Sequence, residues 1–281
     1  MNGGGPSRPR LLGCDFSSTP TRRKPIVIAW GTRRDETVVL EALEYFPTLG
    51  AWTQRLAQAP AWIGGFDFPF GLPREFVAAQ DWPLDWAGCM ATYTALSRAE
   101  LRLRFMAFCA ARPVGGKFAH RAADRPAGSS PSMKWVNPPV AWMMHAGVPG
   151  LLAVGAWLPG QGGSQGSTRI ALEAYPGLVA RDLLGSRSYK SDDRAKQTTQ
   201  RQDARRTLLG GLIEGRGRLG LRLDAPAELR RVLLDDASGD ALDAALCLML
   251  AAWGEARTKS EGPGYGLPAW MDPLEGWILG A

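Results

Sequence analysis

Short apolar runs separated by polar turns define the first part of the chain. Residues 11–16, 25–30 and 36–42 are three such runs, rich in apolar or β-branched side chains, and the turns between them contain Thr, Arg and Asp. Runs of this length between turn residues are typical of β-strands. Their close succession predicts a three-stranded antiparallel meander.

A helix and a buried strand are predicted next. In residues 49–59, Leu49, Trp52 and Leu56 recur at helical spacing, and Pro60 ends the segment before the apolar run 61–66. Three strands, a helix and a fourth strand favour an α/β fold with a mixed sheet, in which the fourth strand joins through a right-handed crossover.

The segment 72–166 has the character of a helical insertion. The capping box Ser97-x-x-Glu100 opens one helix, and a glycine-rich loop closes the segment without the G-K-[ST] of a phosphate-binding loop. A fifth strand is predicted next, at 169–174, and an Ala/Leu-rich helix starts at Asp235. Further helices are predicted near 176–184 and 198–213, and the closing EGWILG is a candidate edge strand. We expect a single domain over residues 1–281.

Composition favours a soluble protein of the cytoplasm. A chain of 281 residues with 45% hydrophobic side chains can bury a sizeable core. Its four cysteines are scattered without a C-x-x-C pair, which predicts reduced core residues. We expect no membrane association, because no apolar stretch of about 18 residues occurs. The formal charge of +6 fits nucleic acid as partner, or simply an arginine-rich composition.

Two aspartates end apolar strands. Asp15 closes the first run in LLGCDFSSTP, and Asp67 follows the fourth in WIGGFDFPFGLP. A buried carboxylate is costly unless it is paired, hydrogen-bonded or bound to metal. Because the carboxyl ends of parallel strands converge on one crevice, both aspartates are predicted to share a site.

Three more acids fit the same site. Glu173 is the acid of the fifth strand, and Asp240 and Asp243 lie three residues apart on one face of an apolar helix. Five clustered carboxylates require a cation, and oxygen ligands suit Mg²⁺ or Mn²⁺. With only His120 and His145 in the chain, a histidine-rich metal centre is excluded.

Such a site predicts phosphodiester hydrolysis. Two ions about 4 Å apart activate a water and stabilise the leaving oxygen. We expect Asp15 to bridge both ions, with the other acids on either side. Ser17 and Lys190 are candidate substrate-binding residues. Lys190 opens the run 190–206, whose six basic and three acidic side chains give 6 − 3 = +3; this run either binds phosphates or is a solvated helix face.

Each acid also has a purely structural explanation. Asp15 and Asp67 are of the residue type that forms turns. Glu173 has Arg169 and Arg181 as potential ion-pair partners. The first acid of the helical D-x-x-D is favoured at that position by the helix dipole alone.

Several motifs, taken together, resemble a known family. In order, LLGCDFSS, GGFDFPFGLP, ALEAYPGLVARDLLG with SYK after it, DALDAALCLMLAAW and EGWIL resemble an uncharacterised family of predicted ribonuclease-H-like nucleases. The resemblance covers residues 11–279, with the insertion matching least. It implies a five-stranded mixed sheet of order 3-2-1-4-5, strand 2 antiparallel, flanked by helices. The presumed metal acids map onto Asp15, Asp67, Glu173, Asp240 and Asp243.

The expected function is therefore a metal-dependent nuclease acting on DNA or RNA. The helical D-x-x-D is also similar to that of Holliday-junction resolvases. An alternative is an ATP-dependent phosphotransferase or ATP-binding protein of the actin and sugar-kinase type, which begins with a similar G-x-D-x-[ST] strand but needs a second, duplicated domain. A further alternative is a non-catalytic nucleic-acid-binding protein.

Overall fold

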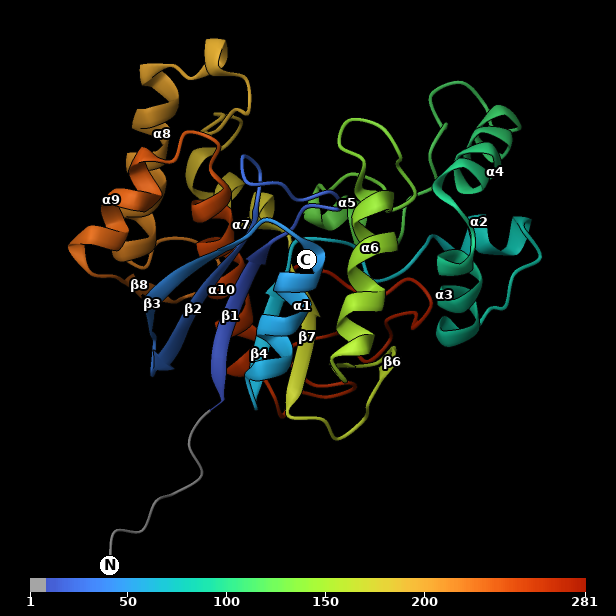
Figure 1. Ribbon diagram of the computed structural model, residues 1–281, viewed down its shortest axis with the longest axis horizontal. Helices are drawn as coiled ribbons and strands as arrows, with labels where there is room; N and C mark the ends of the chain where they lie inside the picture. The colour runs from blue at the N-terminus through green and yellow to red at the C-terminus, as the bar shows by residue number, and fades with distance from the viewer. Residues whose placement is uncertain (1–8) are drawn as a thin grey trace, which may run out of the picture.

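The apolar runs form strands in the computed structural model, which describes residues 9–281 (Figure 1). Residues 1–8, part of the expected single domain, lie outside the described range. The five expected strands are β1 (Arg10–Asp15), β2 (Ile26–Arg34), β3 (Thr37–Phe46), β4 (Trp62–Phe66) and β7 (Arg169–Glu173). The fold is α/β with a mixed sheet, as the alternation of runs predicts.

The sheet has eight strands rather than five, in the order β6-β5-β7-β4-β1-β2-β3-β8. The additional strands are β5 (Trp157–Leu158), β6 (Gly162–Gly163) and β8 (Arg222–Asp224), which are too short to give an alternating pattern in the sequence. β1 pairs antiparallel with β2 and parallel with β4, and β4 pairs parallel with β7. The carboxyl ends of β1, β4 and β7 therefore lie at one edge of the sheet.

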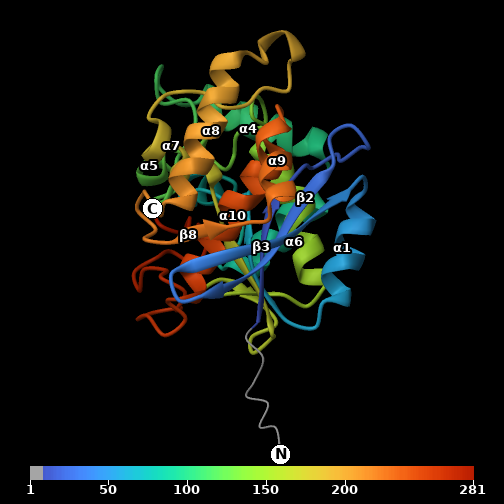
Figure 2. The same ribbon diagram turned by 90° about the vertical axis from the view of Figure 1, so that its left-hand side faces the viewer.

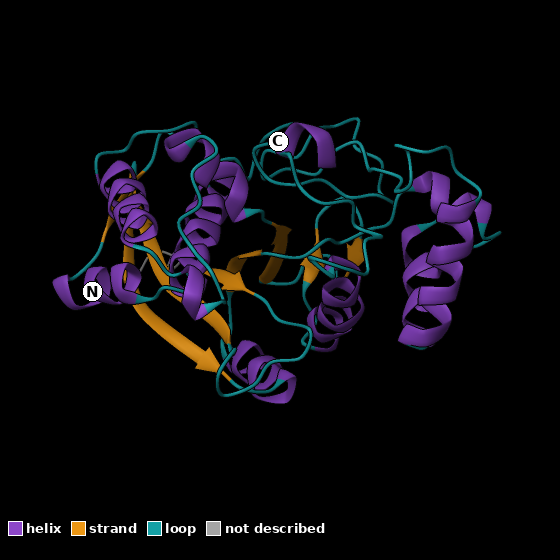
Figure 3. Cartoon of the chain, turned by 90° about the horizontal axis from the view of Figure 1, so that it is seen from above, coloured by secondary structure: helices purple, strands orange, loops and turns teal. Residues whose placement is uncertain are grey.

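Helices cover both faces of the sheet (Figures 2 and 3). Successive strand residues point to opposite faces, so Leu11 packs in one core and Leu12 in the other, as do Val27 and Ile28. The first core includes residues of α7 (Pro176–Leu184), α8 (Thr199–Ile213), α9 (Ala227–Asp235) and α10 (Asp240–Glu255). The second includes residues of α1 (Leu49–Gln58) and of the segment between β4 and β7.

The segment 72–166 is mainly helical, and two short strands within it extend the sheet. Its helices are α2 (Arg74–Ala79), α3 (Trp86–Ala95), α4 (Arg98–Ala110), α5 (Asp124–Ala127) and α6 (Val140–Ala153). The predicted capping box is present at the start of α4, where Ser97 and Glu100 each accept from the other's backbone N–H. The helices α2 to α4 lie at the opposite end of the molecule from α8 and α9 (Figure 1).

Two predicted elements are wrong. The closing EGWILG forms no strand; its residues are buried in turns, and the Leu279 N–H donates to the Glu173 carbonyl oxygen (3.0 Å). The last helix begins at Asp240 rather than Asp235, because α9 extends to Asp235 and Gly239 adopts a left-handed conformation (φ 79°) just before the new helix. Such a backbone turn favours glycine and separates the two helices.

The four cysteines are buried with free thiols, in agreement with the sequence pattern. Among the helices of the described residues, none combines the length and apolar composition that crossing a membrane requires.

Candidate metal site

Two glycines allow α10 to lie directly against β1 and β4. A Cβ atom on Gly13 would lie 2.0 Å from the backbone nitrogen of Leu248, and one on Gly65 would lie 2.5 Å from the carbonyl oxygen of Cys247. Both distances are far below van der Waals contact, so only a residue without a side chain fits at either position. The helix backbone therefore crosses the two strands close to their carboxyl ends.

The same glycines determine where the strand aspartates point. Side chains two residues apart on a strand share a face. Asp15 follows Gly13 by two residues, and Asp67 follows Gly65 by two, so both carboxylates project toward α10. The carboxyl ends of β1 and β4 are also aligned with each other. Cys14 is the register partner of Phe66, and the Asp67 N–H donates to the Cys14 carbonyl oxygen (3.0 Å). The two carboxylates emerge side by side.

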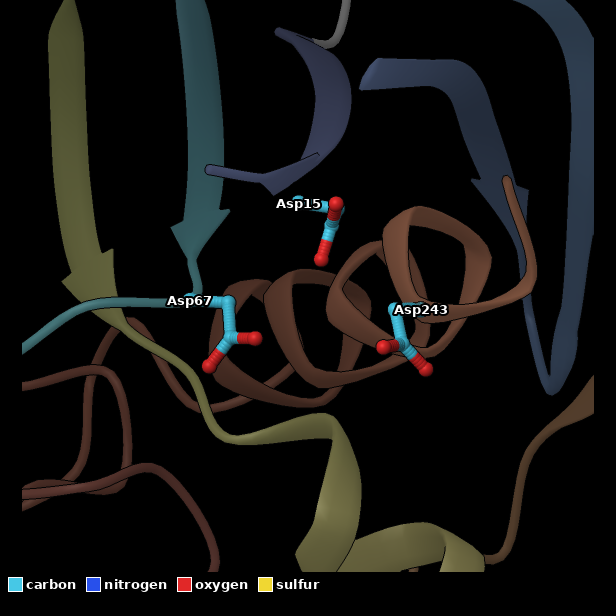
Figure 4. A group of neighbouring side chains, drawn as sticks. All are labelled: Asp15, Asp67 and Asp243. Carbon is cyan, nitrogen blue, oxygen red and sulfur yellow. The ribbon is translucent and has the colours of Figure 1, made fainter. Parts of the chain in front are cut away.

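Asp243 completes a group of three from the first turn of α10. Carboxylate oxygens of Asp15, Asp67 and Asp243 lie within 4.8 Å of one another. Figure 4 shows the three side chains facing a common space between the strand ends and the helix. Asp243 is fully buried, Asp15 is 9% exposed and Asp67 is partly exposed. Three of the five acids singled out in the sequence thus come together.

The environment disfavours three negative charges. Burial, followed by the nearby Asp243 and Asp240 carboxylates, raises the pKa of Asp15 well above its usual value. Burial and Asp243 raise the pKa of Asp67 to about 7, against the lowering effect of Lys190. Carboxylates in this state are stabilised by a bound cation, which restores their charged form.

Tyr189 and Lys190 hold Asp243. The Tyr189 hydroxyl donates to one oxygen of Asp243, and the Lys190 ammonium donates to the other. Gly239 makes room for this lysine, since a Cβ there would lie 2.7 Å from the Lys190 Cβ. Lys190, a predicted substrate-binding residue, therefore adjoins the carboxylates. Ser17, the other such residue, lies in the loop after β1, where its hydroxyl accepts from the Thr19 N–H (3.4 Å).

Glu173 lies outside the group of three and is paired with Arg121. The guanidinium donates to both carboxylate oxygens of Glu173 (2.6 and 2.8 Å), and the Phe70 N–H donates to one of them (3.0 Å). Its ion-pair partner is thus neither Arg169 nor Arg181, the two suggested by the sequence. Arg121, itself buried, is the most important residue that the sequence analysis missed.

Asp240 also lies outside the group of three. It accepts a hydrogen bond from Lys24 of the loop between β1 and β2 (3.1 Å). Its carboxylate nevertheless acts on the site, because it contributes to the raised pKa of Asp15. Tyr189 was present in the SYK motif of the sequence without being assigned a role.

The donor set suits a hard cation. The group of three offers only carboxylate oxygens, the ligands that Mg²⁺ and Mn²⁺ prefer. Cys14 and Cys247 lie nearby, but burial raises the pKa of both thiols well above the usual value. Thiols in this state are poor metal ligands, because metals bind the thiolate form.

Asp67 is reached from two hollows in the surface. The smaller is lined by Asp67, Arg121, Glu173 and Tyr175 among others. The larger, of about 320 Å³, is lined by Asp67, Tyr175 and the residues around Lys190. The candidate site therefore lies where two openings meet, and a dissolved ligand has access to it.

Comparison with known proteins identifies a family. The model of the family described as "Protein of unknown function (DUF429)" matches residues 13–262, which include the three aspartates. No curated protein and no solved structure gives a match. The chain belongs to this family.

Proposed function

We propose that this member of the DUF429 family is a divalent-metal-dependent nuclease that hydrolyses phosphodiester bonds. One observation carries the proposal: Asp15, Asp67 and Asp243, from two strand ends and one helix, bring their carboxylate oxygens within 4.8 Å of one another.

The charges call for a cation. At a separation of about 5 Å and an effective dielectric constant near 20, two carboxylates repel each other by about 3 kcal/mol. Three carboxylates form three such pairs, and the single ammonium of Lys190 offsets only part of the repulsion. A site of this kind is stable when it binds a divalent ion, and the all-oxygen donor set favours Mg²⁺ or Mn²⁺.

Each residue has a distinct role in this proposal. Asp15, Asp67 and Asp243 hold the metal, which when bound activates a water and stabilises the leaving oxygen. Tyr189 and Lys190 fix the orientation of Asp243, and Lys190 adds positive charge beside the scissile phosphate. Glu173 stays with Arg121 and supports the end of β7 instead of binding metal.

The topology supports a ribonuclease-H-like core. Without its three short strands the sheet has the order β3-β2-β1-β4-β7, with β2 antiparallel to β1. This is the order 3-2-1-4-5 that the sequence resemblance implies. We assign β5, β6 and β8 as additions to that core, and residues 72–166 as an insertion within it.

Cleavage of a substrate panel tests the proposal. Labelled single-stranded, duplex and branched DNA and RNA are incubated with the protein and Mg²⁺ or Mn²⁺. We expect cleavage of at least one member, and a loss of 100-fold or more in Asp15→Asn and in Asp243→Asn, since each variant removes a ligand charge from an assembled sheet.

Asp35→Asn is the matched control. Asp35 lies exposed in the turn between β2 and β3 with φ 52°, a conformation that asparagine also tolerates. It is expected to cleave like the wild type. Undiminished cleavage by both site variants, or no cleavage of any panel member by the wild type, would overturn the proposal.

A further inference from the structure

A second hollow continues from the one beside Asp67. The hollow of about 320 Å³ beside Asp67 is lined by Arg187 and Ser188 among others, and the same two residues line a neighbouring hollow of about 580 Å³. Because they share these residues, we treat the two hollows as one groove, the α7–α8 groove, lined by residues 67, 175–177, 180–181, 185–190, 195–196, 198 and 200–201. It leads from the surface beside the start of α8 to the carboxylate of Asp67.

The lining of the α7–α8 groove is strongly cationic. Asp67 contributes the single carboxylate of the lining. The cationic side chains number five, namely Arg181, Arg187, Lys190, Lys196 and Arg201. Two of the cations have acidic partners, Lys190 with Asp243 and Lys196 with Asp193.

The three arginines of the groove donate hydrogen bonds to uncharged oxygens. Arg187 donates to the Leu184 carbonyl oxygen (3.4 Å), and Arg201 donates to the Lys196 carbonyl oxygen and to the Ser188 hydroxyl. Arg181 donates to a carbonyl oxygen of Ala127 and a tyrosine hydroxyl. Within the part of the chain that the structure describes, none of the three forms an ion pair with a carboxylate, although the charge of Arg201 also acts on the nearby Asp193. The positive charges of these arginines favour the binding of an anion in the groove.

Aromatic rings lie at the inner end of the groove. Tyr175 is half-buried, and the guanidinium carbon of Arg181 lies 5.2 Å from its ring centroid; Tyr189 lines the same hollow. A cationic groove with aromatic side chains is typical of single-stranded nucleic-acid binding, in which cations follow the backbone and rings contact bases. The hollow beside Asp67 has a volume of about 320 Å³, which lies at the lower end of the range for small-molecule sites.

We propose that the α7–α8 groove binds a single strand of nucleic acid and leads its backbone to Asp67. Arg187 and Arg201 contact successive phosphates at the outer part of the groove, and Arg181 contacts a phosphate nearer the carboxylates. That the strand is cleaved at Asp67 rests on the proposed function, whereas binding in the groove does not. The substrate class is therefore single-stranded, or a single-stranded region of a branched molecule.

Binding without metal tests the groove separately from catalysis. Fluorescence anisotropy in EDTA measures the affinity for a labelled single-stranded oligonucleotide and for the same sequence as a duplex, over a series of salt concentrations. The test variant is Arg187→Ala/Arg201→Ala. The matched control is Arg34→Ala/Arg102→Ala, which removes two exposed arginines outside the groove.

The expected result is selective. The test variant should bind the single strand at least tenfold more weakly, and its slope of log affinity against log salt should fall by about 1.4, because each lost phosphate contact on a single strand accounts for about 0.7. In the control variant, the loss of affinity and the fall in slope should each be less than half of those in the test variant. Both variants should keep the wild-type circular dichroism spectrum and melting temperature. Duplex should bind more weakly than single strand.

Each failure has its own meaning. If the test variant binds like the control, or if duplex binds more tightly than single strand, the groove assignment is overturned even when the protein cleaves nucleic acid. If the groove variant loses binding while wild type with Mn²⁺ cleaves nothing, the proposed function is overturned and the groove assignment stands.

Discussion

Two carboxylates at neighbouring strand ends differ in what surrounds them. Asp67 follows β4 and Glu173 ends β7, yet Arg121 neutralises Glu173 while Asp67 faces two further aspartates. The acids themselves were predictable, because a lone carboxylate at the end of an apolar strand stands out. Arg121 was not, since it comes from a loop 52 residues earlier in the chain than Glu173 and belongs to no periodic pattern.

The raised pKa of Asp67 makes metal affinity depend on pH. Protons and metal compete for this carboxylate, whose pKa is about 7. We predict that Mn²⁺ affinity rises with pH through the range around pH 7, by about tenfold per pH unit for each proton released, because the protonated carboxyls of Asp67 and Asp15 must lose their protons to bind metal. Calorimetric titration between pH 5.5 and 8.5 checks this, and an affinity independent of pH would contradict it.

The same raised pKa has a consequence for the metal-free protein. The folded state holds a proton that the unfolded chain releases above pH 4, so this residue's contribution to stability falls as pH rises from about 4 to about 7. Above pH 7 and in EDTA, Asp67→Asn is therefore expected to be more stable against unfolding than the wild type. Added Mn²⁺ is expected not to stabilise this variant further.

At the scale of elements, close contact between β1 and α10 assembles the site. Gly13 lets the helix backbone approach the strand. Asp15 at the end of the strand and Asp243 in the first turn of the helix then lie close to each other (Figure 4). The sequence correctly predicted that β1 is a strand and that α10 is a helix. It did not predict how closely they pack, because an isolated glycine in a strand also fits a bulge or a bend.

Gly13→Ala should disrupt this contact. The added Cβ meets helix backbone at 2.0 Å, which no rotamer change relieves, so we expect a loss of about 3 kcal/mol or more in the free energy of unfolding. Gly50→Ala in α1 is the control, since nothing lies within 4 Å of its Cβ and alanine favours the helix by up to about 1 kcal/mol. Urea unfolding measures both, and equal effects would contradict the account.

Sequence pattern located the long elements better than the short ones. The five strands with five or more residues and the helices α1, α7, α8 and α10 were predicted from the sequence, whereas α9 was not. The short strands β5, β6 and β8 contain two or three residues and depend on pairing with neighbours. EGWILG was misassigned because it is apolar for another reason: its residues are buried in turns beside the end of β7.

At the scale of the whole molecule, three features converge on one edge of the sheet. The ends of β1 and β4 and the start of α10 supply the carboxylates, the segment after α7 supplies Tyr189 and Lys190, and the α7–α8 groove opens toward them. Five of the chain's 33 lysines and arginines line this groove together with a single carboxylate. Net charge alone gave no such location, because it does not depend on the fold.

Calorimetric titration of Mn²⁺ tests the central claim most directly. It is applied at pH 7.5 to the wild type, Asp15→Asn, Asp35→Asn and Glu173→Gln. The account predicts binding by the wild type, by Asp35→Asn and by Glu173→Gln, whose amide still accepts from Arg121, and loss of binding in Asp15→Asn. Absence of Mn²⁺ binding in the wild type, or wild-type affinity in Asp15→Asn, would contradict it.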